Sequence, residues 1–528
     1  MRNKAIYFAA AAILAGSALH AQNLNQRVEV TNEFEAKVLE AHRDDLSMTV
    51  PDSVTVFSWD FDYSIFDTPY AGAYEFRPYN MDMVPVTSRP ASNHFYLKAG
   101  AGYTLHPTLT LACDPILGRG FEMGITDNLN GYAGKYCGFG DKFSGYDFTN
   151  RLGVGLHYAG KSSDMFFTAG YGLVAAGDTV QRRYMDDIDF GFRIASTMAS
   201  GLDFDYDFGV DFRMAKDRSA FSPSEIRFGF GGGAGYDIGA GMTIVANAGI
   251  ETLSGFSGKN PFKFEVAPHV KMDFSTTILM VGFKLSVLNT LTNGGVIFPD
   301  ISLRSELLPD HVYANLEFTG GNSIVSVYDQ ISMSHFVWNP APLSQSESFR
   351  IGGWFDGTVL KKLTYKLGAG YRKYSAGVLE SISTLDLGHE LLVLEKYGQF
   401  YADATLAYSS DHIDAGIQAR YTNTSEVKAI APAALTCDAH ASYLWKNRYR
   451  AGLTLRSCSA RTGHYDGTTT AFTLPAYYDL GLNFEYALTS RFALWSQVGN
   501  ALMQDVRRSA LHAEPSIELT AGIRMTLR

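Results

Sequence analysis

The feature of this sequence that most constrains its fold is a period of two in hydrophobicity, which begins near residue 94 and continues to the end of the chain. Apolar and polar residues alternate in segments of 10 to 14 residues. In residues 202 to 214, leucine, phenylalanine, tyrosine, valine and methionine occupy one set of alternate positions, and mostly aspartate occupies the other. Because successive side chains of a strand point to opposite faces, these segments predict long strands with one apolar and one polar face.

Strands of this length match those that cross a bilayer at a tilt. Lipid cannot satisfy an open sheet edge, so such strands must close into a barrel. A large soluble β-sandwich or propeller would have shorter strands, and it would lack the tyrosines at strand ends, such as Tyr158, Tyr408 and Tyr486, that are typical of an interfacial girdle. The composition, 46% hydrophobic and 19% charged, excludes disorder and coiled coil. The predicted fold class is an all-β, transmembrane antiparallel β-barrel.

The strand number follows from the connections, which alternate between short and long. Dividing residues 94–528 at these connections, with 117–145 and 321–345 among the long ones, gives 21 strands. An even number is expected, so the alternating residues 54–66 predict a first strand and a total of about 22, with a range of 18 to 24. Alternatively, residues 54–66 pair inside the lumen and a later loop hides a hairpin. A barrel this wide needs a plug or remains open.

The N-terminal region is predicted to carry a signal peptide followed by a separate segment. Residues 1–21 have Arg2 and Lys4, then an apolar run and small residues, a pattern typical of secretory leaders. Residues 22–93 are expected to form a periplasmic or lumenal segment that partly occludes the lumen or recruits a periplasmic or outer-membrane protein partner. The expected location is the outer membrane of a Gram-negative bacterium, with its lipid around the barrel.

The four cysteines leave two disulfides open. Cys113 and Cys137 flank a loop, and Cys437 and Cys458 lie on two strands of one hairpin, in a compartment that permits pairing. The second pair has opposite phase, so its members point to opposite faces unless a bulge intervenes. No metal site is expected, because the sequence has no CxxC motif and no close Cys/His spacing.

The hairpin formed by residues 187 to 213 predicts a charged lumen lining. A three-residue turn after residue 198 would place Arg193 opposite Asp207, Asp187 opposite Arg213 and Asp189 opposite Asp211. The last pair is unfavourable unless a cation, another basic strand or a protonated carboxylate relieves it, so a cation or basic-ligand site and a solvated charge ladder both remain open. The predicted cluster consists of Asp187, Asp189, Arg193, Asp203, Asp205, Asp207, Asp211 and Arg213.

Glycines occupy alternate positions on the polar face of the following strand. The predicted track is Gly229, Gly231, Gly233 and Gly235. Glycine in a strand permits curvature or the close approach of another backbone. The track therefore indicates either barrel curvature or a smooth groove for a threaded segment or an elongated ligand.

Charge and motifs exclude other function classes. The net charge of −10 has the wrong sign for a nucleic-acid partner. No GxSxG or HExxH signature is present, and histidines near acids are too common in this chain to indicate a catalytic set. We therefore expect no enzymatic activity, no catalytic residues and no cofactor.

Several short motifs resemble a known group of proteins. These are Val28-Glu29-Val30-Thr31, Asp62-Tyr63-Ser64-Ile65, Thr68-Pro69-Tyr70, Phe76-Arg77-Pro78, and an Asn339-Pro340 loop followed by Gly352-Gly353. Together they resemble plug-less, TonB-dependent-receptor-like outer-membrane β-barrel proteins of the Bacteroidota. The resemblance implies an outer-membrane barrel and supplies no catalytic or ligand-binding residues.

Two functions are consistent with these features. The first is a passive or gated channel or transporter, porin-like, for small or elongated solutes. The alternative is a structural or assembly barrel that anchors external loops or recruits periplasmic or outer-membrane partners.

Overall fold

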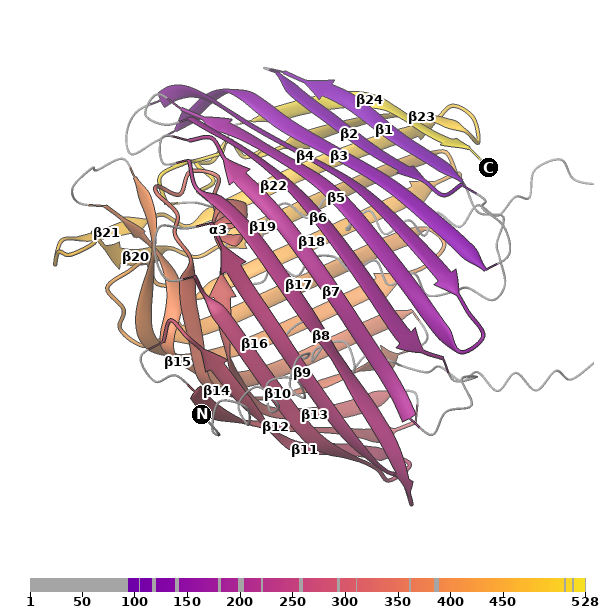
Figure 1. Ribbon diagram of the computed structural model, residues 1–528. Helices are drawn as coiled ribbons and strands as arrows, with labels where there is room; N and C mark the ends of the chain where they lie inside the picture. Colours follow the sequence, from indigo (N-terminus) through magenta and orange to yellow (C-terminus); the bar gives the residue numbers. More distant parts are fainter. Residues whose placement is uncertain are drawn as a thin grey trace, which may run out of the picture.

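The computed structural model describes a single closed β-barrel (Figure 1). Its 22 strands form one sheet in which neighbours are antiparallel, and the sheet closes where β1 pairs with β24, with Phe95 opposite Leu527. A two-stranded sheet and one short helix lie in the connections. The described residues are 94–527 except 104, 116–119, 138–141, 179–181, 198–203, 220–221, 256–259, 292–294, 310, 360–361, 384–388, 508–509 and 515–516.

Each element spans a defined part of the sequence. The barrel strands are β1 (Phe95–Gly102), β2 (His106–Cys113), β3 (Phe121–Cys137), β4 (Lys142–Ala159), β5 (Ser163–Gly177), β6 (Arg182–Ser196), β7 (Phe204–Asp217), β8 (Ser224–Gly239), β9 (Met242–Ser254), β10 (Phe262–Asp273), β11 (Thr277–Leu288), β12 (Gly295–Leu308), β13 (Val312–Val325), β14 (Leu343–Val359), β15 (Leu363–Ile382), β16 (Glu390–Ser409), β17 (Ile413–Thr424), β18 (Leu435–Trp445), β19 (Tyr449–Cys458), β22 (Tyr477–Ala487), β23 (Phe492–Gly499) and β24 (Glu518–Leu527). The connections contain the helix α3 (Val327–Met333) and the hairpin β20 (Arg461–His464) and β21 (Ala471–Leu474).

The predicted number of strands is confirmed, but one strand had been placed wrongly. Residues 54–66 lie outside the described residues, and the barrel closes without them. The additional strand is β3, which lies within the interval 117–145 that was assigned to a loop. Its pattern is weak because Asp127 and Gly131 stand at positions where the outward face should carry apolar residues. The hidden strand therefore replaces the predicted N-terminal one.

The order of the strands fixes the end of the barrel at which each connection lies. All neighbouring strands are antiparallel. When the 22 barrel strands are counted in chain order, the connections after the first, third and every later odd-numbered strand therefore lie at one end of the barrel, and the other connections lie at the opposite end. The first end carries long connections such as 326–342, 459–476 and 500–517 and is called the loop end. The opposite end carries tight turns such as 410–412 and 446–448 and is called the turn end. The turn around residue 104 is short and yet lies at the loop end, so it departs from the predicted alternation of short turns and long loops.

The outward face of the barrel is apolar. Large hydrophobic side chains at alternate positions are exposed, among them Phe208 (39%), Phe228 (40%), Leu316 (56%) and Leu453 (42%). Tyr158 and other tyrosines near strand ends are exposed as well, as expected for an interfacial girdle. An apolar band around a closed, tilted barrel is the architecture of outer-membrane barrels, so the predicted fold class and outer-membrane type are confirmed.

No helix in the described part of the chain combines the length and hydrophobicity needed to cross a bilayer.

The cysteines are not paired in the described structure. Cys113, Cys437 and Cys458 carry free thiols. On strands β18 and β19, Cys437 is opposite Ser457 and Cys458 is opposite Thr436. No bulge intervenes, so the two thiols stay on opposite faces, and neither of the two disulfides left open by the sequence is formed.

Candidate functional site

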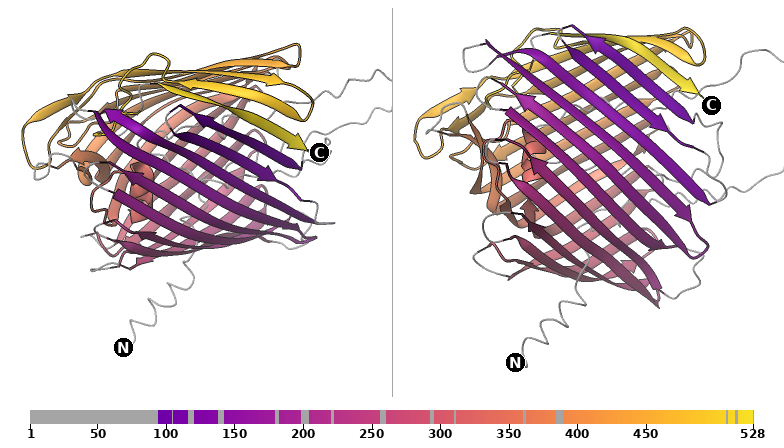
Figure 2. Two further views of the ribbon diagram at one scale, coloured as in Figure 1. Left: turned by 90° about the horizontal axis from the view of Figure 1, so that it is seen from above. Right: turned by 45° about the horizontal axis from the view of Figure 1, so that its top comes forward.

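The segment between β13 and β14, residues 326–342, folds into the lumen and is called the lumenal segment. Figures 1 and 2 show its helix α3 inside the barrel, near the end that carries β20 and β21. The helix begins at Ser326, whose side chain accepts a hydrogen bond from the Asp329 amide, while the Asp329 side chain accepts one from the Ser326 amide. This reciprocal capping box satisfies two amides at the N-terminus of a short helix. Local sequence thus starts the helix, and the barrel wall must stabilise it.

Apolar and polar contacts fix α3 against the inner wall. Tyr328 and Ile331 pack against Met185 of β6 and Ala215 of β7 in one buried cluster. The amide of Val327 donates a 2.7 Å hydrogen bond to a Glu225 carboxylate oxygen on β8. Because carboxylates near a helix N-terminus are favoured by the helix dipole and its free amides, this bond orients the segment.

Arg151 joins α3 to the predicted charge cluster. Its guanidinium donates to Asp187 at 2.7 Å, to Asp189, and to the Tyr328 hydroxyl at 3.3 Å. Arg213 lies 4.1 Å from the centre of the Tyr328 ring, a cation–π contact. Burial, and then the negative charge of Asp187, raise the pKa of Tyr328, so its hydroxyl stays protonated. Two arginines therefore contact one tyrosine of the lumenal segment, and two aspartates hold Arg151 in place.

Arg183 of β6 holds the second half of the segment. Its guanidinium donates to the carbonyl of His335 at 2.8 Å and to the carbonyl of Val337 at 2.6 Å, and its Nε donates to Asp217 at 2.9 Å. Both Arg183 and Asp217 are buried. The His335 ring lies 2.8 Å from the carboxylate of Asp147 on β4. A charged hydrogen bond in a buried site is stronger than a neutral one, so these contacts anchor the segment at several points.

A third group links the lumenal segment to the connection between β23 and β24. Glu390 accepts hydrogen bonds from the Ser334 hydroxyl at 2.6 Å and from the Leu511 amide at 2.7 Å. The His512 ring lies 3.3 Å from Glu390 and 3.0 Å from Asp178, and it stacks on Phe336 with 3.6 Å between ring centres. Burial alone would lower the pKa of His512, but its hydrogen bonds to the two carboxylates raise the pKa to about 9. A protonated His512 thus bridges two carboxylates at the loop end.

The predicted register of β6 and β7 was wrong by two residues. Asp189 lies opposite Arg213, not Asp211, and Asp187 lies opposite Ala215. Arg193 lies opposite Gly209, but its guanidinium still reaches Asp207 diagonally, with 2.8 Å and 2.5 Å between donor and acceptor atoms. The repulsive pair of Asp189 and Asp211 that suggested a cation site is therefore absent. Arg151 neutralises Asp187 and Asp189.

The remaining members of the predicted cluster are placed separately from the lumenal segment. Asp205 accepts a hydrogen bond from Ser196 at 3.2 Å, and Asp211 lies opposite Gly229. Asp203 lies outside the described residues. The structure thus divides the cluster into a part that contacts α3 and a part toward the turn end.

Neighbouring side chains occupy the space beside two of the predicted track glycines. A Cβ at Gly229 would meet the carboxylate of Asp211, and one at Gly233 would meet the Asn247 amide. At Gly235, a Cβ would make only ordinary contacts of 3.4 Å or more. Gly231 lies opposite Gly209. At Gly229 and Gly233 the missing side chains therefore make room for polar neighbours, not for a groove.

Sequence reasoning missed the residues that anchor the segment. They are Arg151 of β4, Arg183 of β6, Glu225 of β8 and Glu390 of β16, which lie far from the segment in the sequence. The helix that carries Tyr328 was missed as well. The available signals were the length of the connection 321–345 and the Ser326–Asp329 capping spacing. Among the described residues, no group of three or more histidine, cysteine, aspartate or glutamate residues is arranged to hold a metal ion.

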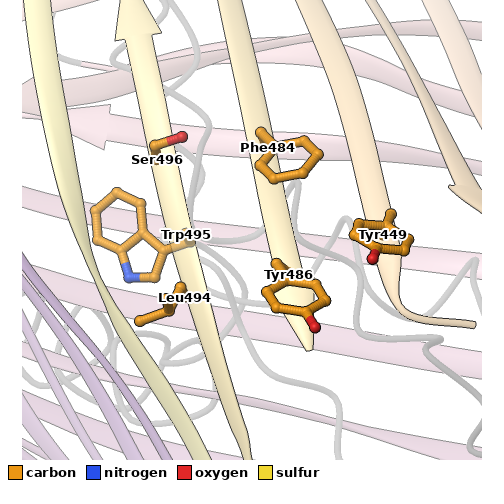
Figure 3. Close-up of a pocket in the computed structure, with 6 residues that line it drawn as sticks. All are labelled: Tyr449, Phe484, Tyr486, Leu494, Trp495 and Ser496. Carbon is orange, nitrogen blue, oxygen red and sulfur yellow. The ribbon is translucent and has the colours of Figure 1, made fainter. Parts of the chain in front are cut away.

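A shallow hollow lies on strands β19, β22 and β23, toward the turn end (Figure 3). Tyr449, Phe484 and Tyr486 line it with their rings, together with Leu494, Trp495 and Ser496. Phe484 shares the outward face with the exposed Leu482. The hollow therefore belongs to the aromatic girdle of the outer wall and not to the lumen.

Comparisons with solved structures show the same barrel fold. The ferric enterobactin receptor PfeA of Pseudomonas aeruginosa has a TM-score of 0.59 at 10% identity, covering 83% of this chain and 81% of the receptor. The FrpB iron transporter of Neisseria meningitidis has a TM-score of 0.61 at 8% identity, covering 82% of each chain. The copper transporter OprC has a TM-score of 0.58 at 11% identity, covering 82% of this chain and 80% of the transporter.

The sequence comparisons gave no relatives: no family model and no curated protein matches this chain. At this identity the structural likeness shows the fold alone. It supports the resemblance to receptor-like outer-membrane barrels at the level of the barrel.

Proposed function

We propose that this protein is an outer-membrane channel or transporter whose lumen is gated at the loop end by the lumenal segment. The observation that carries the proposal is the set of charged contacts, through Arg151, Arg183 and Glu225, that hold an inward-folded helix against the wall of a 22-strand barrel. A barrel of this width is not filled by its own side chains. A segment folded inside it is therefore placed to control passage.

The nature of the anchors favours a gate over a permanent plug. α3 has only seven residues, and it is held by one small buried apolar cluster together with individual ion pairs and hydrogen bonds. Loops with such attachments open at lower free energy than the strands around them. The solved structures that share the fold are named as receptors and transporters for ferric enterobactin, iron and copper, which supports a role in uptake.

The N-terminal region belongs to the same proposal. Residues 1–21 serve as a signal peptide, and residues 22–93 form a periplasmic or lumenal segment that occludes the turn end or binds a periplasmic partner. In this respect the protein is proposed to be a plug-less member of the receptor-like barrels of the Bacteroidota. Barrel residues 94–528 form the unit that crosses the membrane.

Single-channel recording tests the proposal. The mature chain, a form lacking residues 22–93, an Arg183→Met variant and the combination are each reconstituted in a planar bilayer. Arg183→Met removes two hydrogen bonds to the lumenal segment, so it should increase the frequency of open events. The combined form should conduct most.

Arg193→Met is the matched control. Arg193 also points inward from β6, but it pairs with Asp207 and does not hold the lumenal segment. The conductance of Arg193→Met should equal that of the mature chain without a substitution. Silence in all four forms would refute transport and favour the assembly barrel.

A further inference from the structure

A polar pair interrupts the apolar outer wall at mid-strand. On β3, Asp127 lies opposite Leu111 of β2 and Leu152 of β4, and Leu152 is exposed on the outward face. The next residues, Asn128 and Arg151, form the adjacent pair, and Arg151 points inward to Tyr328. Alternation therefore places the side chain of Asp127 on the face that meets lipid.

Asn150 of β4 is the second member of the pair. It lies opposite Leu129, two positions along the same face, and its Nδ2 donates a 2.9 Å hydrogen bond to Oδ1 of Asp127. Among the described residues, neither side chain makes a second hydrogen bond. An amide nitrogen has two hydrogens and a carboxylate has two oxygens. One donor of Asn150 and Oδ2 of Asp127 are thus left facing outward.

The pair lies away from both ends of β3 and β4. Asp127 is six residues from Phe121, which marks the turn end of β3. Six residues span roughly 20 Å of strand, which a tilt of about 40° reduces to roughly 15 Å of depth in a band about 25 Å tall. Acyl chains against this face offer no hydrogen bonds. Polar side chains in this position are rare and usually have a partner.

The wall beside the pair is also too short for the band. Strands β1, β2 and β23 have eight residues each, whereas β3 has 17 and β4 has 18. Figure 2 shows the short strands β1 and β2 beside the longer ones that follow. A transmembrane strand needs about 9 to 11 residues. A wall that is too short thins the bilayer or is relieved by oligomerisation.

We propose that the face formed by β2, β3 and β4 is a docking surface for a second copy of this chain. Both copies share one membrane orientation, so the dimer axis lies along the membrane normal and the contact is isologous. The free amide hydrogen of Asn150 in each copy then donates to Oδ2 of the partner subunit's Asp127. The pair contains donor and acceptor in equal number, so the surface is complementary to itself. This inference is independent of the proposed gate.

Subunit counting in lipid bilayers tests the dimer. The full-length protein is labelled with a fluorophore and reconstituted at increasing protein-to-lipid ratios, and the dimer fraction is measured by single-molecule photobleaching. The wild-type dimer fraction should rise with the ratio. Asp127→Leu and Asn150→Leu should each weaken association by about tenfold or more, because each removes both exchanged bonds. Asp127→Asn keeps an acceptor and should retain most of the association.

Leu316→Ala is the control for the outer wall. Leu316 is exposed to lipid on β13, away from the proposed contact, and its loss should leave the dimer fraction unchanged. Heat-modifiable migration on gels verifies that each variant is a folded barrel. The proposal is overturned if the wild type stays monomeric at every ratio, or if Asp127→Leu associates as the wild type does. A complex with a different membrane protein that depends on Asp127 would also overturn the second copy as the occupant.

Discussion

Replacing Arg183 by methionine should release the lumenal segment while leaving the barrel closed. The substitution removes the hydrogen bonds to the carbonyls of His335 and Val337. Bonds to a charged group are each worth about 1.5 to 3 kcal/mol, so even the lower sum, about 3 kcal/mol, corresponds to about a hundredfold more opening. Asp217 keeps two hydrogen bonds from Ser219, which limits the damage to β7.

Amide hydrogen exchange measures this opening. In the closed segment the amide of Ser334 donates to the backbone carbonyl of Gln330 at 3.1 Å. The amide of Trp338 donates to the backbone carbonyl of Glu390 at 2.7 Å. Their exchange should accelerate about a hundredfold in Arg183→Met, and Arg193→Met should leave it unchanged. Equal protection of these amides in the wild type and Arg183→Met would refute the reasoning.

Three further predictions concern other parts of the barrel. Bonds to carboxylates raise the pKa of His512 from 6.5 to about 9, so the stabilisation of residues 510–514, on the order of 3 kcal/mol, is present below about pH 6.5 and lost as pH rises through about 9. The protection of these amides, corrected for the intrinsic exchange rate at each pH, should fall over that window, and it should not change over that window in His512→Gln. Gly522→Ala brings a Cβ into the carbonyl of Ala99 and should lower the unfolding temperature, whereas Gly124→Ala, with open space, should not. Replacing Cys437 and Cys458 by serine should leave the unfolding temperature within a few degrees of the wild type, because both thiols are free and no disulfide is lost. Loss of a disulfide would instead lower stability by about 2 to 4 kcal/mol.

The barrel was predictable because lipid and water impose opposite demands on alternate residues. Strands such as β7 and β24 carry this alternation without interruption, and closure follows from the need to satisfy every backbone group. β3 was missed because Asp127 and Gly131 break its outward face. The same departure from the pattern marks the surface that we propose for dimer contact.

The register and the lumenal segment could not be derived locally. A shift of the hairpin between β6 and β7 by two residues preserves the face of every side chain, so hydrophobicity does not distinguish the two registers. Tyr328 meets Arg151, which lies 177 residues earlier in the chain. The capping spacing of Ser326 and Asp329 predicts a helix start but not the wall against which the helix packs.

The central claim, that the lumenal segment gates a conducting barrel, is tested most directly by single-channel conductance. The form lacking residues 22–93 is compared with the same form carrying Arg183→Met, in one bilayer system. The account predicts rare openings in the first and frequent openings of the same or larger size in the second. Identical records from the two forms would contradict it.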